Sequence, residues 1–174
     1  MTFAVPASLK NLYDVPTLQK RIKELGAQIT EDYRGKDLVL VAILKGSFPF
    51  LADLCREIAL PLSVEFLGLS SYGEGTQSTG VVRITQDLSK PIDGKDVLII
   101  EDIVDTGLTL RYIEENFQTR NPNSIEVCSL LDKPSGRKID VEARYVGFTI
   151  GSHFVVGYGL DLADKYRNLP YIGY

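Results

Sequence analysis

The chain has 174 residues, of which 44% are hydrophobic and 24% are charged, as in a single globular domain with a buried core. Its formal net charge of −4 disfavours a nucleic-acid partner, because nucleic-acid-binding proteins carry a basic surface. The longest apolar run, residues 38–44, is far too short to cross a membrane, and no secretory signal opens the sequence. We therefore expect a cytoplasmic protein with no membrane or nucleic-acid partner.

Cysteine and histidine are scarce, and this disfavours several classes of site. Cys55 and Cys128 are too few for a disulfide scaffold, so we expect two reduced, buried thiols. With His153 as the single histidine, neither a zinc site nor a Ser-His-Asp triad is favoured.

Helical and extended patterns alternate along the chain. The first helix is predicted over residues 16–33, although Gly26 inside it costs about 1 kcal/mol relative to alanine. A second helix is predicted with Ser47 as its N-cap, a third follows Gly107, and residues 70–80 are predicted to form a loop. Strands are predicted over residues 38–44, 62–69, 81–87, 97–100, 124–131, 145–150 and, briefly, 154–158.

This alternation predicts an α/β fold, a mostly parallel twisted sheet flanked by helices on both faces. The sequence shows no internal repeat and no linker, so we expect one domain over residues 1–174. Ligands of such sheets bind beyond the carboxyl ends of the strands. The residues that follow each aliphatic strand are therefore the candidates for function.

The strongest functional pattern lies in residues 97–110. An aliphatic strand runs into two adjacent carboxylates, Glu101 and Asp102, which repel each other and are poor core residues. A cation or several sugar hydroxyls would stabilise the pair. The next residues offer backbone N–H groups at a helix N-terminus, which suit a phosphate monoester. They are Asp105, Thr106, Gly107, Leu108 and Thr109.

A purely structural role is an alternative for several charged and polar residues. Asp105 could be the N-cap of the following helix, with Thr109 incidental, and Arg137 with Lys138 is predicted to lie in a solvated turn. The sequence contains no Walker loop. No G-x-G-x-x-G pattern follows a strand either, which disfavours a Rossmann dehydrogenase.

Residues 97–110 resemble the phosphoribosyl-pyrophosphate motif of the type I phosphoribosyltransferases. Four further segments, in family order, narrow the resemblance to the hypoxanthine (hypoxanthine-guanine) phosphoribosyltransferases. They are residues 44–47, 71–73, 130–134 and 154–161, the last running on to residue 170. The resemblance implies the type I phosphoribosyltransferase fold, with a core over about residues 35–150 and a small hood built from residues 1–34 and 151–174.

The resemblance also implies an activity. The family transfers the 5-phosphoribosyl group of phosphoribosyl pyrophosphate to N9 of a 6-oxopurine, with Mg²⁺ as cofactor. For this chain it implies a purine salvage enzyme that makes IMP from hypoxanthine and GMP from guanine, as a homodimer or homotetramer. A xanthine-preferring enzyme is one alternative. A non-catalytic regulator that senses phosphoribosyl pyrophosphate is another, which the acidic balance of the chain disfavours.

Roles on the sugar side follow by the same resemblance. Glu101 and Asp102 order the ribose hydroxyls and the metal, and Asp161 supports the metal or the pyrophosphate through water. Asp105 is the general acid/base beside purine N7, and the backbone N–H groups of residues 106–109 hold the 5′-phosphate.

Further residues are implied at the pyrophosphate, the lid and the purine. Lys45 and Gly46, often through a cis peptide bond, contact pyrophosphate together with Arg167, while Ser71 and Tyr72 begin a lid that excludes water.

Four residues are implied on the purine side of the site. Lys133 donates to the 6-oxo group, which distinguishes an oxopurine from adenine, and Phe154 stacks on the ring. Val155 meets the base edge, and Asp161 lies on the same side of the purine. His153 departs from the family pattern, which leaves the ranking of hypoxanthine, guanine and xanthine open.

Overall fold

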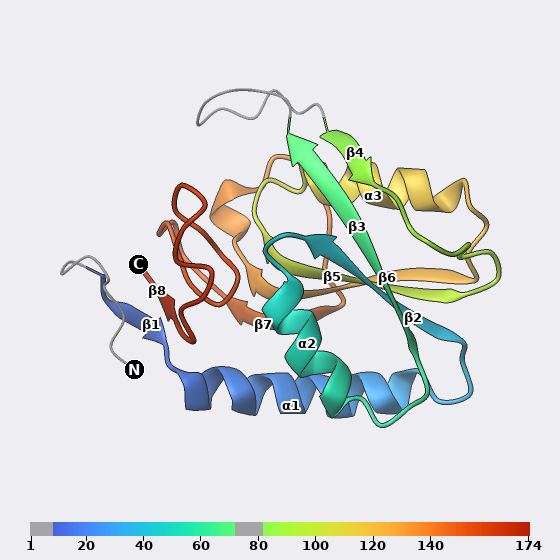
Figure 1. The fold of residues 1–174 in the computed structure, drawn as a ribbon, viewed down its shortest axis with the longest axis horizontal. Helices are drawn as coiled ribbons and strands as arrows, with labels where there is room; N and C mark the ends of the chain where they lie inside the picture. Colours follow the sequence, from blue (N-terminus) through green and yellow to red (C-terminus); the bar gives the residue numbers. More distant parts are fainter. Residues whose placement is uncertain (1–8, 72–81) are drawn as a thin grey trace.

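The computed structural model describes residues 9–71 and 82–174, in which strands and helices alternate (Figure 1). None of the helices in these residues is long and apolar enough to cross a membrane. The helices are α1 (Val15–Asp32), α2 (Phe48–Glu57) and α3 (Leu108–Gln118), with a short 3₁₀ turn at Pro134–Gly136. The strands are β1 (Asn11–Tyr13), β2 (Leu38–Leu44), β3 (Ser63–Ser71), β4 (Val82–Gln86), β5 (Asp96–Val104), β6 (Ser124–Asp132), β7 (Tyr145–Thr149) and β8 (Ile172–Gly173).

Six strands form one sheet in the order β4-β3-β2-β5-β6-β7. Neighbouring strands run parallel from β3 to β7, while β4 pairs antiparallel with β3 at one edge. This arrangement confirms the predicted mostly parallel sheet. A second, two-stranded sheet pairs β1 with β8 and so joins the two ends of the described chain.

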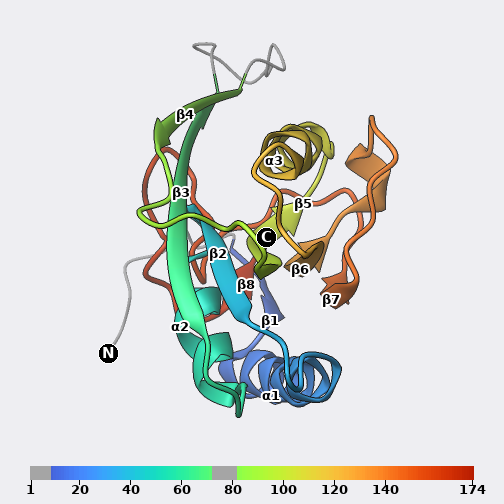
Figure 2. The same cartoon turned by 90° about the vertical axis from the view of Figure 1, so that its right-hand side faces the viewer.

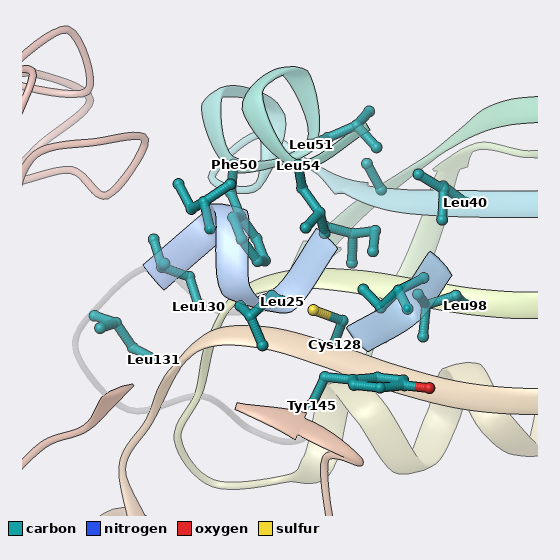
Figure 3. Close-up of a cluster of buried hydrophobic side chains, with 14 of the residues drawn as sticks. Leu25, Leu40, Phe50, Leu51, Leu54, Leu98, Cys128, Leu130, Leu131 and Tyr145 are labelled. Carbon is teal, nitrogen blue, oxygen red and sulfur yellow. The ribbon is translucent and has the colours of Figure 1, made fainter. Parts of the chain in front are cut away.

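Helices cover both faces of the large sheet, as predicted (Figure 2). Successive residues of the central strands belong alternately to two cores, because side chains alternate across a strand. Leu40 and Leu98 face α1 and α2, whereas Val41 and Ile99 face α3. Figure 3 shows the first of these cores, where Cys128 is fully buried among leucines. Cys55 is only partly buried, contrary to the prediction.

The two helices on the first face touch backbone to backbone. Gly26 in α1 lies against the end of α2, and an added Cβ would stand 2.5 Å from Cβ of Glu57. One turn later the Thr30 hydroxyl donates to the Gly26 carbonyl (2.7 Å) and accepts from the N–H of Ala59 (3.0 Å). Gly26 is therefore part of a helix contact, in addition to being a weak helix former.

Ser47 is the N-cap residue of α2, as predicted, but its hydroxyl donates to the Ile43 carbonyl (2.6 Å) and forms no capping bond. The last predicted strand is wrong. Residues 154–158 form no regular strand, because the chain turns at Tyr158 (φ 50°), and a single bridge joins Val156 to Gly173. The sequence also fails to predict β1 and β8, since strands of three and two residues show no periodicity.

Candidate active site

The acid pair lies inside β5, which continues past the predicted strand end to Val104. The prolongation is stabilised by β6, since Glu101 pairs with Ser129 and Ile103 with Leu131. Burial, together with the neighbouring Asp102 carboxylate, raises the pKa of Glu101 well above its usual range. Two carboxylates held this way favour the arrival of a cation or of hydroxyl donors.

Asp102 is the second acid, and its environment is mixed. Burial raises its pKa to about 6, although the N–H of Ile103 donates to its Oδ1 (2.8 Å) and favours the ionised form. Its other oxygen lies against Gly46, where an added Cβ would stand 1.6 Å from Oδ2. The turn after β2 and the end of β5 thus meet around this carboxylate.

The loop from Asp105 to Gly107 leads into α3. Gly107 is the N-cap residue with φ 82°, a left-handed conformation that favours glycine, and no side chain caps the helix. Asp105 is therefore not the N-cap, and the simpler interpretation of this residue is wrong. The Thr106 hydroxyl accepts from the N–H of Leu108 (3.4 Å). The first turn of α3 directs backbone N–H groups out of the helix end, as an anion site requires.

Asp105 faces Lys133, as two residues of one site should. Oδ2 of Asp105 lies 3.5 Å from Nζ of Lys133, which is largely buried at the end of β6. Arg137, predicted to lie in a solvated turn, is instead partly buried. It pairs with the Asp132 carboxylate and donates to the Asp105 carbonyl (3.2 Å). The sequence gives no signal for this contact, because it depends on how the turn folds back.

The turn after β2 carries Lys45 and Gly46. The cis peptide bond of this turn joins Leu44 to Lys45. The Lys45 side chain is exposed, and its Nζ lies 3.6 Å from Oδ1 of Asp164. Gly46 lies at the bottom of the turn, and its carbonyl contacts Gly159, whose added Cβ would stand 1.9 Å from that oxygen. Residues far apart in sequence are thus in direct contact here.

Asp161 and Arg167 lie in the C-terminal segment and bind each other. Nη2 of Arg167 is 2.5 Å from Oδ1 of Asp161, and Nη1 donates to the Gly159 carbonyl (2.7 Å). The other oxygen of Asp161 accepts from the N–H of Asp164 (2.8 Å). Arg167 therefore orders this irregular loop, and it also helps to keep Asp102 ionised.

Three adjoining cavities lie at this end of the sheet. The loop cavity, about 90 Å³, runs along Asp105–Gly107. The acid cavity, about 320 Å³, includes Gly46, both acids of β5 and Arg167; it shares Glu101 and Thr109 with the loop cavity. The lysine cavity, about 240 Å³, is joined to the acid cavity by Asp102 and Asp161. It is lined by Asp102, Ile103, Asp105, Lys133, His153, Phe154, Val155, Leu160 and Asp161.

The lysine cavity has the predicted purine-side residues in its wall. Phe154 is 64% exposed, unusually high for a large aromatic side chain, whereas Val155 beside it is buried. His153 also lines the cavity and packs on Tyr174, with ring centroids 4.5 Å apart. The sequence gives no role to His153 or Tyr174, and in the structure His153 lies in the cavity wall with Tyr174 packed against it.

Two further predicted features are the lid and the metal site. Ser71 ends β3 and pairs with Val82, but Tyr72 lies outside the described residues, so the lid stays a prediction. In residues 9–71 and 82–174, no three side chains of the His, Cys, Asp and Glu types gather closely enough to hold a metal ion by themselves. Asp102 and Asp161 do line one cavity. One or two carboxylates suit Mg²⁺ when substrate phosphates supply its other oxygens.

Comparison with known proteins identifies the family of this chain. The family model described as phosphoribosyl transferase domain matches residues 8–163. A hypoxanthine-guanine phosphoribosyltransferase of Staphylococcus aureus (strain Mu50 / ATCC 700699) is 58% identical over 90% of this chain and 87% of its own length. One from Bacillus subtilis (strain 168) is 51% identical over 94% of this chain and 91% of its own.

Solved structures give the same result. A hypoxanthine phosphoribosyltransferase from Staphylococcus aureus superposes with a TM-score of 0.91 at 55% identity, covering 94% of this chain and 89% of that one. A hypoxanthine-guanine phosphoribosyltransferase from Bacillus anthracis, with HEPES in its active site, gives 0.90 at 46% identity, covering 94% and 96%. The chain therefore belongs to the phosphoribosyltransferase family, on the hypoxanthine-guanine branch. The predicted fold and family are confirmed.

Proposed function

We propose that this protein transfers the 5-phosphoribosyl group of phosphoribosyl pyrophosphate to N9 of hypoxanthine and of guanine, making IMP and GMP for purine salvage. One observation carries the proposal. The Asp105–Lys133 pair lines a cavity that joins the buried acid pair, so a base and a sugar can meet at one point. The relatives named above support the same activity.

The purine occupies the lysine cavity. Lys133 donates to the 6-oxo oxygen and has no acceptor for the 6-amino group of adenine, which sets the preference for oxopurines. Phe154 presents an exposed ring on which the base stacks, and Val155 faces the base edge. When the bond between C1′ and N9 forms, the purine loses a proton from N7, and the Asp105 carboxylate accepts it.

The sugar occupies the acid and loop cavities. The bond between C1′ and the pyrophosphate oxygen breaks as the bond to N9 forms, and positive charge develops at C1′. Glu101 and Asp102 accept hydrogen bonds from the ribose hydroxyls, and their negative charge stabilises the cationic sugar. Backbone N–H groups of residues 106–109 bind the 5′-phosphate.

The pyrophosphate group of the substrate lies beside the turn after β2. The backbone at Lys45 and Gly46 and the guanidinium of Arg167 bind the leaving group, with Asp161 beside them. Asp102 and Asp161 would hold Mg²⁺, which neutralises charge on the pyrophosphate when bound. Ser71 and Tyr72 begin the lid, and residues 151–174 with the N-terminal segment form the hood.

We also propose a cytoplasmic homodimer or homotetramer. Large apolar side chains are exposed on α2 and on the neighbouring part of β3, namely Phe48, Val64 and Phe66. Such groups favour association with another subunit. Analytical ultracentrifugation over a range of concentrations tests this, and a monomer at micromolar concentration would contradict it.

An initial-rate assay tests the function. Folded protein with Mg²⁺ and phosphoribosyl pyrophosphate should convert hypoxanthine and guanine to nucleotides and leave adenine unchanged. A preference for xanthine would replace the proposed specificity. Binding of phosphoribosyl pyrophosphate without turnover of any 6-oxopurine would favour the non-catalytic regulator.

A further inference from the structure

The turn that follows β6 is bonded along its length to the loop between β5 and α3. The N–H of Lys133 donates to the Val104 carbonyl (3.0 Å). Farther along, the N–H groups of Lys138 and Ile139 both donate to the Thr106 carbonyl (3.0 and 3.3 Å). These bonds fix the backbone on both sides of Asp105, because Asp105 lies between Val104 and Thr106.

Arg137 adds the side-chain bond in the middle of this contact. Its Nη1 donates to the Asp105 carbonyl (3.2 Å), and its Nη2 pairs with the carboxylate of Asp132, the last residue of β6. The two side chains are 19% and 18% exposed. A planar guanidinium can bind both acceptors at once, whereas an ammonium group on a flexible stem cannot match that geometry.

The same turn touches the Asp105 carboxylate itself. An added Cβ on Gly136 would stand 1.6 Å from Oδ1 of Asp105, so the turn backbone is in direct contact with this oxygen. The other oxygen faces Lys133 at 3.5 Å. The carboxylate is therefore held between turn and lysine, while Arg137 holds the main chain behind it.

We infer that Arg137 is a positioning residue for the transfer reaction: it fixes the backbone of Asp105 so that the carboxylate meets the purine proton at the correct place. The inference rests on the proposed function. Arg137 lines none of the loop, acid and lysine cavities, so it acts through Asp105 and touches no substrate. A misplacement of about 1 Å in such a group can cost about 10²-fold in rate.

Kinetics of Arg137→Met test this inference. The value of kcat should fall about 10²-fold, while KM for phosphoribosyl pyrophosphate changes less than about threefold, because the phosphate loop keeps its backbone bonds. Arg137→Lys retains the charge beside Asp132 and should lose about tenfold in kcat. Arg111→Met is the matched control. Arg111 also donates to a carbonyl of this region, that of Asp140 (2.7 Å), but it is exposed and its bond goes to residue 140 instead of to Asp105, so kcat should stay unchanged.

A double variant separates positioning from charge balance. In the double variant Arg137→Met with Asp132→Asn, no carboxylate is left at position 132 without a charged partner. The Asp105 carbonyl, however, still lacks the hydrogen bond from Arg137. We expect kcat to stay low, and recovery to the wild-type rate would overturn the inference. Wild-type kcat in folded Arg137→Met would do the same, whereas a wild-type protein with no transfer activity would overturn the proposed function instead. If Arg137→Met does not fold, Arg137→Lys with unchanged kcat overturns the inference.

Discussion

The candidate active site is assembled from two regions of opposite character. Residues 101–109 form a strand end, a short loop and a helix start, so neighbours in sequence are neighbours in the site. Residues 151–174 contain only isolated bridges and one two-residue strand. Their path depends on left-handed backbone at non-glycine residues, among them Tyr158, Ala163 and Tyr166.

The difference shows how each region acquires its shape. The first is fixed by the regular hydrogen bonds of the sheet and by the start of α3. The second is fixed from outside, by the contact of Gly159 with Gly46 and by the Tyr158 hydroxyl, which donates to Asp53 on α2. We therefore expect variants in the first region to change the chemical step, and variants at the supports of the second to change purine binding.

The largest effect should come from Asp105→Asn in the first region. An amide cannot accept the purine proton, so kcat should fall by about 10²–10⁴-fold. Binding of phosphoribosyl pyrophosphate, measured by calorimetry, should change little because the backbone N–H groups are kept. Normal turnover in folded protein would remove the acid/base role of this residue.

A smaller effect is expected for Lys133→Ala, which lies where the two regions meet. Loss of a charged hydrogen bond to the 6-oxo group should reduce the preference for hypoxanthine over adenine by about 10–10²-fold. The ratio of kcat/KM for the two bases measures it. An unchanged ratio would show that another group reads the 6-position.

A still smaller effect is expected for Tyr158→Phe, which breaks one support of the second region. KM for hypoxanthine should rise by about three- to tenfold, with kcat nearly unchanged. Tyr145→Phe is the matched control, because its hydroxyl donates to Asp32 (2.7 Å) on the far end of α1. Both variants should lose similar stability, about 1 kcal/mol, in thermal melts. Equal KM values for the two would contradict the distinction between the regions.

The smallest effect concerns the stability of Asp102→Asn, a variant whose activity should also fall because this carboxylate binds the ribose in the proposed function. Burial raises the pKa of Asp102 to about 6, so the folded state holds a proton that the unfolded chain releases at lower pH. Stability should therefore fall as pH rises from about 4 to 6 and stay lower above it. The variant should melt about 2–6 °C higher than wild type at pH 8 and at nearly the same temperature at pH 4. An equal gain at both pH values would exclude this cause.

The sequence predicts elements with continuous apolar patterns well, and it predicts poorly the segments whose shape depends on distant contacts. The strand at residues 38–44 is reproduced to the residue, because a continuous aliphatic run has one stable place in a parallel sheet. The length of β5 is underestimated, since its last residues are extended by pairing with Leu131 and Asp132 of β6. Arg137 is missed for a similar reason. Nothing in its neighbourhood shows that the turn folds back onto Asp105.

The contact between α1 and α2 bears on how this protein could be made more thermostable. Replacing a helical glycine by alanine is a standard stabilising change, worth up to about 1 kcal/mol when the site is open. At Gly26 the new methyl group would meet the Glu57 carbonyl, 2.7 Å away, as well as its Cβ. The two helices would have to separate, and with them the Thr30 bond to Ala59. A ranking of positions by helix propensity alone would place Gly26 among the first to replace, and the resulting protein would be less stable.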